Sequence, residues 1–137
     1  MKDISNLTEN EKRVVDFLRM LENRQSNTAL AHFYHPDIEQ IEYPNAITKT
    51  TAIRKLADLK AGADRGKQIL SKEEYKVVNI VSAGETVVLE CIWTGTLAIP
   101  VGKIEAGSQM KAYFAQVFEF KEGKIFKQRN YDCFEPF

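Results

Sequence analysis

Cysteine is scarce in this chain of 137 residues, and no charge of either sign is in excess. The only cysteines, Cys91 and Cys133, form neither a CxxC motif nor a disulfide framework, although a bridge between them stays open. A reduced, cytoplasmic protein is therefore the default expectation. Lysine plus arginine equals aspartate plus glutamate, at 19 each, so no basic surplus points to nucleic acid or to an anionic membrane.

Long apolar runs and cofactor motifs are also missing. No stretch approaches the roughly 20 residues that cross a bilayer, and "MKDISNLTENEK" has no apolar signal core. There is no nucleophile elbow, and "KAGADRGK" lacks the spacing of a phosphate loop. His32, His35 and Asp37 only loosely suggest metal ligands, and no convincing third ligand for zinc accompanies the histidines, so we expect no metal site.

The composition, 44% apolar and 28% charged, is that of an ordinary globular protein, and we expect residues 1–137 to form one domain. The first half has helical signals. A capping box at Thr8–Glu11 predicts the start of a helix. "TALAHFYH" predicts a second helix that stops at Pro36, "DIEQIEYPN" a short strand, and "TTAIRKLADLKAGA" a third helix with Gly62 near its end.

From about Ser71 the apolar period changes from helical to two. Four strands are predicted, in "EEYKVVNIV", "TVVLECIWTGTLAI", "SQMKAYFAQVFEF" and the closing "GKIFKQRNYDCFEPF". Consecutive hairpins make an antiparallel sheet, so helices followed by strands predict an α+β fold.

Both faces of the third of these strands are largely apolar. One face carries Met110, Ala112, Phe114, Gln116, Phe118 and Phe120, and the other carries Tyr113, Ala115 and Val117. The helices can cover only one side of a sheet, so we expect a homodimer through the outer face, with partial exposure as the alternative.

The closing strand alternates as well. Its faces carry Phe126, Gln128, Asn130, Asp132 and Phe134 on one side and Ile125, Lys127, Arg129, Tyr131 and Cys133 on the other. The first face places two amides and a carboxylate between phenylalanines. Such a face is either solvated or lines a cavity with a few polar groups in an apolar wall.

The order of elements resembles the nuclear-transport-factor-2-like superfamily, in its SnoaL-like and ketosteroid-isomerase-like branch. The resemblance covers nearly the whole chain and is carried by "HFYHPDIEQIEYPN", "IWTGT", "FEFKEGKI" and "RNYD". It implies a cone-shaped, curved antiparallel sheet wrapped around three N-terminal helices, a cystatin-like α+β barrel with a deep pocket. It also implies dimerisation through the outer sheet face and no cofactor, because side chains alone can run the proton transfers of this fold.

The positions of this chain that match the family's catalytic residues hold other residue types. The isomerase base matches Tyr43, its oxyanion aspartate matches Gln116, and its tyrosine donor lies near Leu18. Both acids are therefore absent, and steroid isomerisation by that mechanism is not expected. The cyclase aspartate matches Asn130, whose neutral amide cannot be a base. Asp132 lies two residues on, on the same face, and could serve as a displaced base with a raised pKa.

The predicted site therefore has Asp132 as catalytic residue, and the ligand-binding residues are Asn130, Gln116, Tyr43, Trp93, Phe114, Phe118 and His32, the last near the pocket mouth. The alternatives are a salt-bridged Asp132, satisfied buried amides, and core roles for Tyr43 and Trp93. Two functions stay open. One is binding of a small apolar ligand with cyclase, isomerase or dehydratase chemistry, and the other is a noncatalytic dimeric binding or association module.

Overall fold

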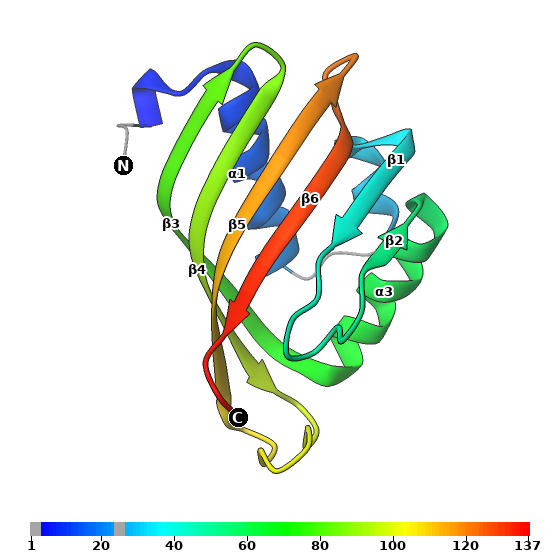
Figure 1. Cartoon of the computed structure of the whole chain (residues 1–137), viewed down its shortest axis with the longest axis vertical. Helices are drawn as coiled ribbons and strands as arrows, with labels where there is room; N and C mark the ends of the chain where they lie inside the picture. The colour runs from blue at the N-terminus through cyan, green and yellow to red at the C-terminus, as the bar shows by residue number, and fades with distance from the viewer. Residues whose placement is uncertain (1–3, 24–26) are drawn as a thin grey trace.

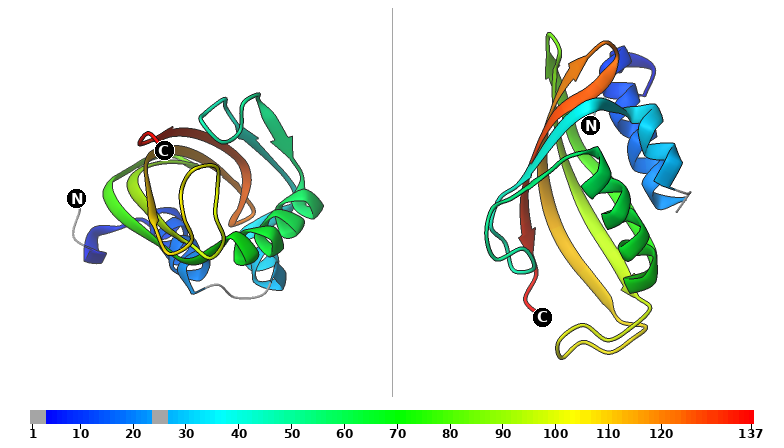
Figure 2. Two further views of the ribbon diagram at one scale, coloured as in Figure 1. Left: turned by 90° about the horizontal axis from the view of Figure 1, so that it is seen from below. Right: turned by 90° about the vertical axis from the view of Figure 1, so that its right-hand side faces the viewer.

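One strongly curved, six-stranded sheet runs the length of the molecule, with its helices on one face (Figures 1 and 2). This computed structural model describes residues 4–23 and 27–137. The helical elements are η1 (Ile4–Asn6), α1 (Glu9–Glu22), η2 (Asn27–Ala29), α2 (Leu30–Phe33) and α3 (Leu56–Ile69). The strands are β1 (Tyr34–Glu42), β2 (Ala52–Arg54), β3 (Leu70–Ala83), β4 (Thr86–Leu97), β5 (Gln109–Lys121) and β6 (Lys124–Phe134).

The strand order is β2-β1-β6-β5-β4-β3. The α+β class, the curved sheet and the N-terminal helices are confirmed, as is the antiparallel run of hairpins from β3 to β6. One pairing differs from the prediction, because β1 runs parallel to β6. These two strands are far apart in the sequence, and no hairpin turn fixes their relative direction.

Helix α1 begins where the capping box predicts. The Thr8 hydroxyl accepts a hydrogen bond from the Glu11 backbone N–H at 3.1 Å, and the Glu11 carboxylate accepts one from the Thr8 N–H at 3.2 Å. Val14, Phe17 and Leu18 then recur on one face and are at most 2% exposed. This apolar stripe packs into the core against the inner face of the sheet.

The other two helices differ from the prediction. The second ends at Phe33, and Pro36 lies inside β1, where β2 pairs only with Gln40–Glu42 and the ladder to β6 shifts register. The absence of a backbone N–H group at Pro36 therefore breaks few hydrogen bonds of the sheet. The third helix starts later, because the Asp58 carboxylate accepts from the Lys55 N–H at 2.9 Å, and it continues past Gly62 to Ile69.

The β5–β6 hairpin corrects the predicted face of Phe126. Glu122 and Gly123 both have positive φ, 56° and 75°, as a type I′ turn requires. The β5–β6 register then shifts between Glu119 and Phe120, which leaves Phe126 as an extra residue. Ile125 is consequently buried in the core, whereas Phe126 packs on the His35 ring, 5.2 Å away.

The outer face of the sheet carries exposed apolar side chains. Val88, Tyr113 and Tyr131 are 38%, 42% and 44% exposed, and within the described ranges no helix covers them. The cysteines lie on opposite faces, with Cys91 buried and Cys133 exposed, and both are free thiols. In the part of the chain that the structure describes, no helix has the length and apolar character to cross a membrane.

Candidate functional site

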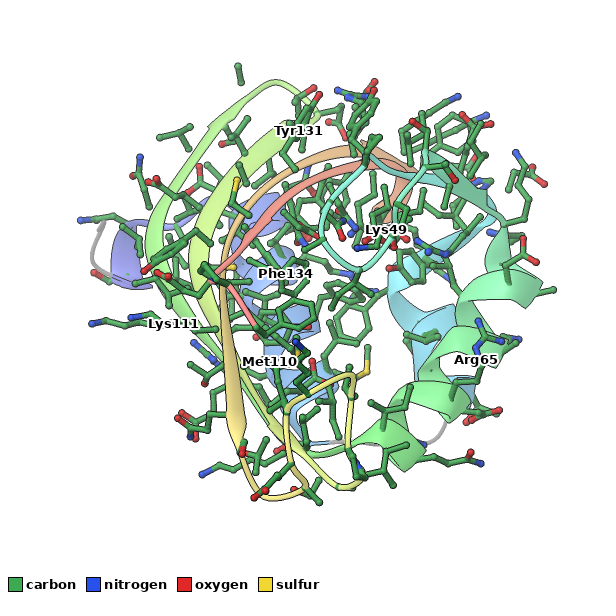
Figure 3. The ribbon with its side chains drawn as sticks, turned by 60° about the horizontal axis from the view of Figure 1, so that its bottom comes forward. Lys49, Arg65, Met110, Lys111, Tyr131 and Phe134 are labelled. Atoms are coloured by element: carbon green, nitrogen blue, oxygen red, sulfur yellow. The ribbon has the colours of Figure 1, made fainter. Side chains whose placement is uncertain are left out.

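A cavity of about 460 Å³ lies between the inner face of the sheet, α1 and α3. This volume is in the range of small-molecule sites. Its apolar lining includes Phe17, Met20, Leu21, Leu30, Leu59, Tyr75 and Phe114, and its polar lining includes Tyr34, Gln40, Glu42, Arg54, Gln116, Gln128, Asn130 and Asp132. Figure 3 views the end of the molecule where the 43–51 loop carries Lys49 and α3 carries Arg65.

Asp132 is the most unusual polar group of this lining. Its Oδ1 atom is buried and has no hydrogen-bond partner among the described residues. The pKa of Asp132 is raised to about 7, mainly by burial and also by the negative charge of Glu42, while the positive charge of Arg54 opposes both. Buried polar atoms in folded proteins nearly always have partners. The raised pKa and the unpartnered oxygen make Asp132 the candidate for proton exchange with a ligand.

Glu42 has the opposite environment. Burial alone would raise the pKa of Glu42, but hydrogen bonds from Asn45 and Arg54 outweigh it, and the pKa is lowered. Arg54 Nη1 lies 2.6 Å from Glu42 Oε1, and Asn45 Nδ2 lies 2.7 Å from Oε2. The two carboxyl groups thus have pKa values that are pushed apart, so that Glu42 stays ionised while Asp132 titrates.

A chain of hydrogen bonds orients the amides beside Asp132. The Tyr34 hydroxyl donates to Gln128 Oε1 at 3.0 Å, and Gln128 Nε2 donates to Asn130 Oδ1 at 2.9 Å. The Asn130 Nδ2 group makes no hydrogen bond within the described residues, so it can donate to a ligand. Across the β5–β6 ladder, Gln116 faces Asn130, is 6% exposed, and makes no side-chain hydrogen bond within the described ranges.

Four of the predicted site residues lie together on the cavity lining. They are Asp132, Asn130, Gln116 and Phe114. Trp93 and Phe118 lie outside the lining, because Trp93 stacks behind Phe114 at 5.7 Å and Phe118 packs in the core against Phe17. They support the wall of the cavity from the core side.

Tyr43 and His32 are not where the cavity hypothesis placed them. Tyr43 packs its ring on Tyr131 at 4.9 Å, and Tyr131 projects from the outer side of the sheet (Figure 3). His32 is exposed rather than buried, and its backbone carbonyl accepts from Arg13. The alternation of side chains along β1 explains the position of Tyr43. Ile38, Gln40 and Glu42 share the inner face of β1, so residue 43 must point to the other face.

The sequence reasoning missed Tyr34, Gln40, Glu42 and Arg54. The inner position of Gln40 and Glu42 could have been inferred from Ile38 by the period of two. Arg54 offered no signal, because its strand is three residues long and looks like part of a helix. Within residues 4–23 and 27–137, no group of three or more His, Cys, Asp or Glu side chains could hold a metal ion.

The sequence of residues 14–128 matches the family model of the SnoaL-like domain. The chain belongs to the SnoaL-like family. Among solved structures, this SnoaL-like chain is similar to IdmH, a candidate polyketide cyclase from Streptomyces antibioticus, with 13% identity, 91% of this chain and 92% of that chain covered, and a TM-score of 0.77.

Two further solved structures are similar. A candidate polyketide cyclase from Acidithiobacillus ferrooxidans has 16% identity, 96% and 91% coverage and a TM-score of 0.75. A LEH-like epoxide hydrolase from M. tuberculosis has 20% identity, 93% and 83% coverage and a TM-score of 0.68. At such identities these likenesses show the fold alone. No curated protein matches the sequence significantly.

Proposed function

We propose that this SnoaL-like protein binds a small, largely apolar molecule in the cavity and moves a proton on it with Asp132. The observation that carries the proposal is the buried, unpartnered Oδ1 atom of Asp132 on the lining of a mostly apolar cavity. A general base works best when its pKa lies near the working pH, and the pKa of about 7 meets that condition.

The arrangement suits removal of a proton from carbon next to a carbonyl group. The ionised Asp132 takes the proton, and negative charge develops on the carbonyl oxygen of the substrate. The free N–H donors of Asn130 and Gln116 can bind that oxygen. Protonated Asp132 then returns the proton to another carbon in an isomerisation, or to a departing hydroxyl group in a dehydration.

The similar solved structures give support of a general kind. IdmH and the Acidithiobacillus ferrooxidans protein are described as candidate polyketide cyclases, and the M. tuberculosis protein as an epoxide hydrolase. Proton transfer to or from a small organic molecule would be common to such reactions. We therefore propose a cyclase, isomerase or dehydratase whose acid–base chemistry uses side chains.

A ligand screen tests this function. Mass spectrometry of the denatured protein looks for a copurified molecule, and thermal shift finds ligands that raise the melting temperature. An enzyme turns over its ligand, and Asp132→Asn lowers kcat by at least about 100-fold with a small change in affinity. Asp16→Asn, which removes an exposed carboxylate of α1, is the matched control. Binding that survives in Asp132→Asn, with no turnover by either protein, would instead indicate a noncatalytic binding module.

We also propose that the outer sheet face forms a homodimer. Val81 and Val88 are cross-strand partners on this face, and Tyr113 and Tyr131 extend the exposed apolar surface across β5 and β6. Light scattering at micromolar concentration should give the mass of a dimer, and Val88→Glu should give a monomer. A wild-type protein that is monomeric throughout the micromolar range would refute the dimer.

A further inference from the structure

Two positions of α3 that line the cavity have no side chain, although larger residues of the same helix also line it, namely Asp58, Leu59, Arg65, Lys67 and Ile69. Leu59, Gly62, Ala63 and Gly66 follow the i, i+3, i+4, i+7 spacing of one helix face, and all of them line the cavity. None of the helix residues is fully buried. Gly62 and Gly66 lie one turn apart, and we call the strip of bare helix backbone at these two residues the glycine trough.

The backbone does not require glycine at these two positions. The described glycines with positive φ are in turns and loops at Gly84, Gly102, Gly107 and Gly123, whereas Gly62 and Gly66 are helical. A Cβ atom at Gly66 would meet nothing within 4 Å, and one at Gly62 would lie 3.6 Å from Arg65 Nη2, which is an ordinary contact.

Alanine would therefore fit at both sites without strain. It is also the better residue for a helix interior, where only proline is worse than glycine. The chain forgoes helix stability at two positions that share one property, which is that they face the cavity. Because glycine lacks the methyl group of alanine, these two positions leave additional space in the cavity.

A second, independent observation indicates that a ligand binds in this space. Gln116 is a residue that is 6% exposed, lines the same cavity, and makes no side-chain hydrogen bond among the residues that the structure describes. The amide atoms of Gln116 are not sealed inside the protein, so they can form hydrogen bonds with a molecule in the cavity. A bound molecule with an oxygen atom would supply the missing partner.

We propose that Gly62 and Gly66 are specificity-determining residues, which admit a flat ring system between the trough and the rings of Tyr75 and Phe114. A planar apolar body can lie close to helix backbone that carries no side chains, and Tyr75 and Phe114 contribute aromatic rings to the cavity lining on the sheet side. The proposal rests on the proposed function only in using the same cavity as the ligand site.

Two probes of different size test the trough. Calorimetry measures the binding of 2-naphthol, which has two fused rings, and of phenol, which has one, to the wild type, Gly62→Ala, Gly66→Ala and the double variant. We expect the double variant to bind 2-naphthol at least about 10-fold more weakly and phenol within about 2-fold of the wild type, because the added methyl groups remove the space for the second ring.

The melting temperature of the same variants is a second measurement. Since alanine stabilises a helix interior, each substitution should raise the melting temperature of the free protein by roughly 3 °C. A loss of affinity with a gain in stability is not what a damaged fold produces. Ala61→Gly, on the exposed opposite side of α3, is the control and should lower the melting temperature without changing the affinity for 2-naphthol.

Several results would overturn the proposal. They are unchanged 2-naphthol affinity in the double variant, a lowered melting temperature in both single variants, or a wild type that binds neither probe. Probe binding needs no proton transfer, so such a failure would leave the role of Asp132 standing. Conversely, an Asp132→Asn variant with undiminished turnover would refute the proposed chemistry and leave the trough intact.

Discussion

Replacing Asp132 by asparagine should make the protein more stable, and by an amount that grows with pH. The folded chain holds the Asp132 proton up to a pKa of about 7, whereas the unfolded chain releases it near 3.8. Between these two pH values the folded state binds more protons than the unfolded state, so the stability of the wild type falls as pH rises. Asparagine cannot ionise, and the variant lacks this loss.

The magnitude follows from the two pKa values. Each pH unit between them is equivalent to about 1.4 kcal/mol, so the raised pKa of Asp132 costs the wild type about 4 kcal/mol of stability at pH 8 and about 2 kcal/mol at pH 5. Below pH 4 the cost nearly vanishes. We therefore expect Asp132→Asn to gain about 2.5 kcal/mol over the wild type between pH 5 and pH 8.

Urea denaturation at pH 5 and pH 8, followed by circular dichroism, measures this difference. Asp16→Asn, which changes an exposed carboxylate of α1, is the matched control and is measured at the same two pH values. An advantage of Asp132→Asn that stayed constant, within about 0.5 kcal/mol, would show that Asp132 is not held in an environment that disfavours its charge.

Three further predictions concern the packing and the electrostatics. Gly95→Ala should destabilise the fold by about 1–3 kcal/mol and shift the fluorescence of the single tryptophan, because the new Cβ would lie 2.5 Å from the Trp93 ring; an unchanged emission spectrum would contradict this. Thr8→Ala should cost about 1 kcal/mol in urea denaturation, and Thr8→Ser should largely restore it, since the cap accepts from the Glu11 N–H. Arg54→Gln should move the midpoint of the pH–rate profile upward, because Arg54 lowers the pKa of Asp132; a downward shift would exclude that role.

Much of the fold could be predicted because local signals and tertiary structure agree. The Thr8 capping box, the period of two from β3 to β6 and the hairpin turns each depend on neighbours in the sequence. β2 was missed because a strand of three residues has no period of its own, and it exists only because it pairs with Gln40–Glu42. The parallel β1–β6 pair joins segments far apart in the chain, and no local pattern encodes it.

The candidate site likewise contains residues that could be predicted from the sequence and residues that could not. Asn130 and Gln116 were found because the resemblance matches them to catalytic positions of the family, and Asp132 because the alternation of β6 puts it on the same face as Asn130. The resemblance misled at Tyr43, where matching a motif position ignored the alternation that turns this side chain to the outer face. The Glu42–Arg54 pair, which shapes the pKa of Asp132, needs both β1 and β2 in place and was beyond local reasoning.

The ionisation of Asp132 itself is the most direct test of the account. Protein labelled with ¹³C at the aspartate carboxyl groups can be titrated by NMR, and the Asp132 resonance identified by its loss in Asp132→Asn. The account predicts a midpoint near pH 7 for this resonance. A midpoint below about pH 5 would mean that Asp132 is an ordinary paired carboxylate, and the proton-transfer site would have to be abandoned.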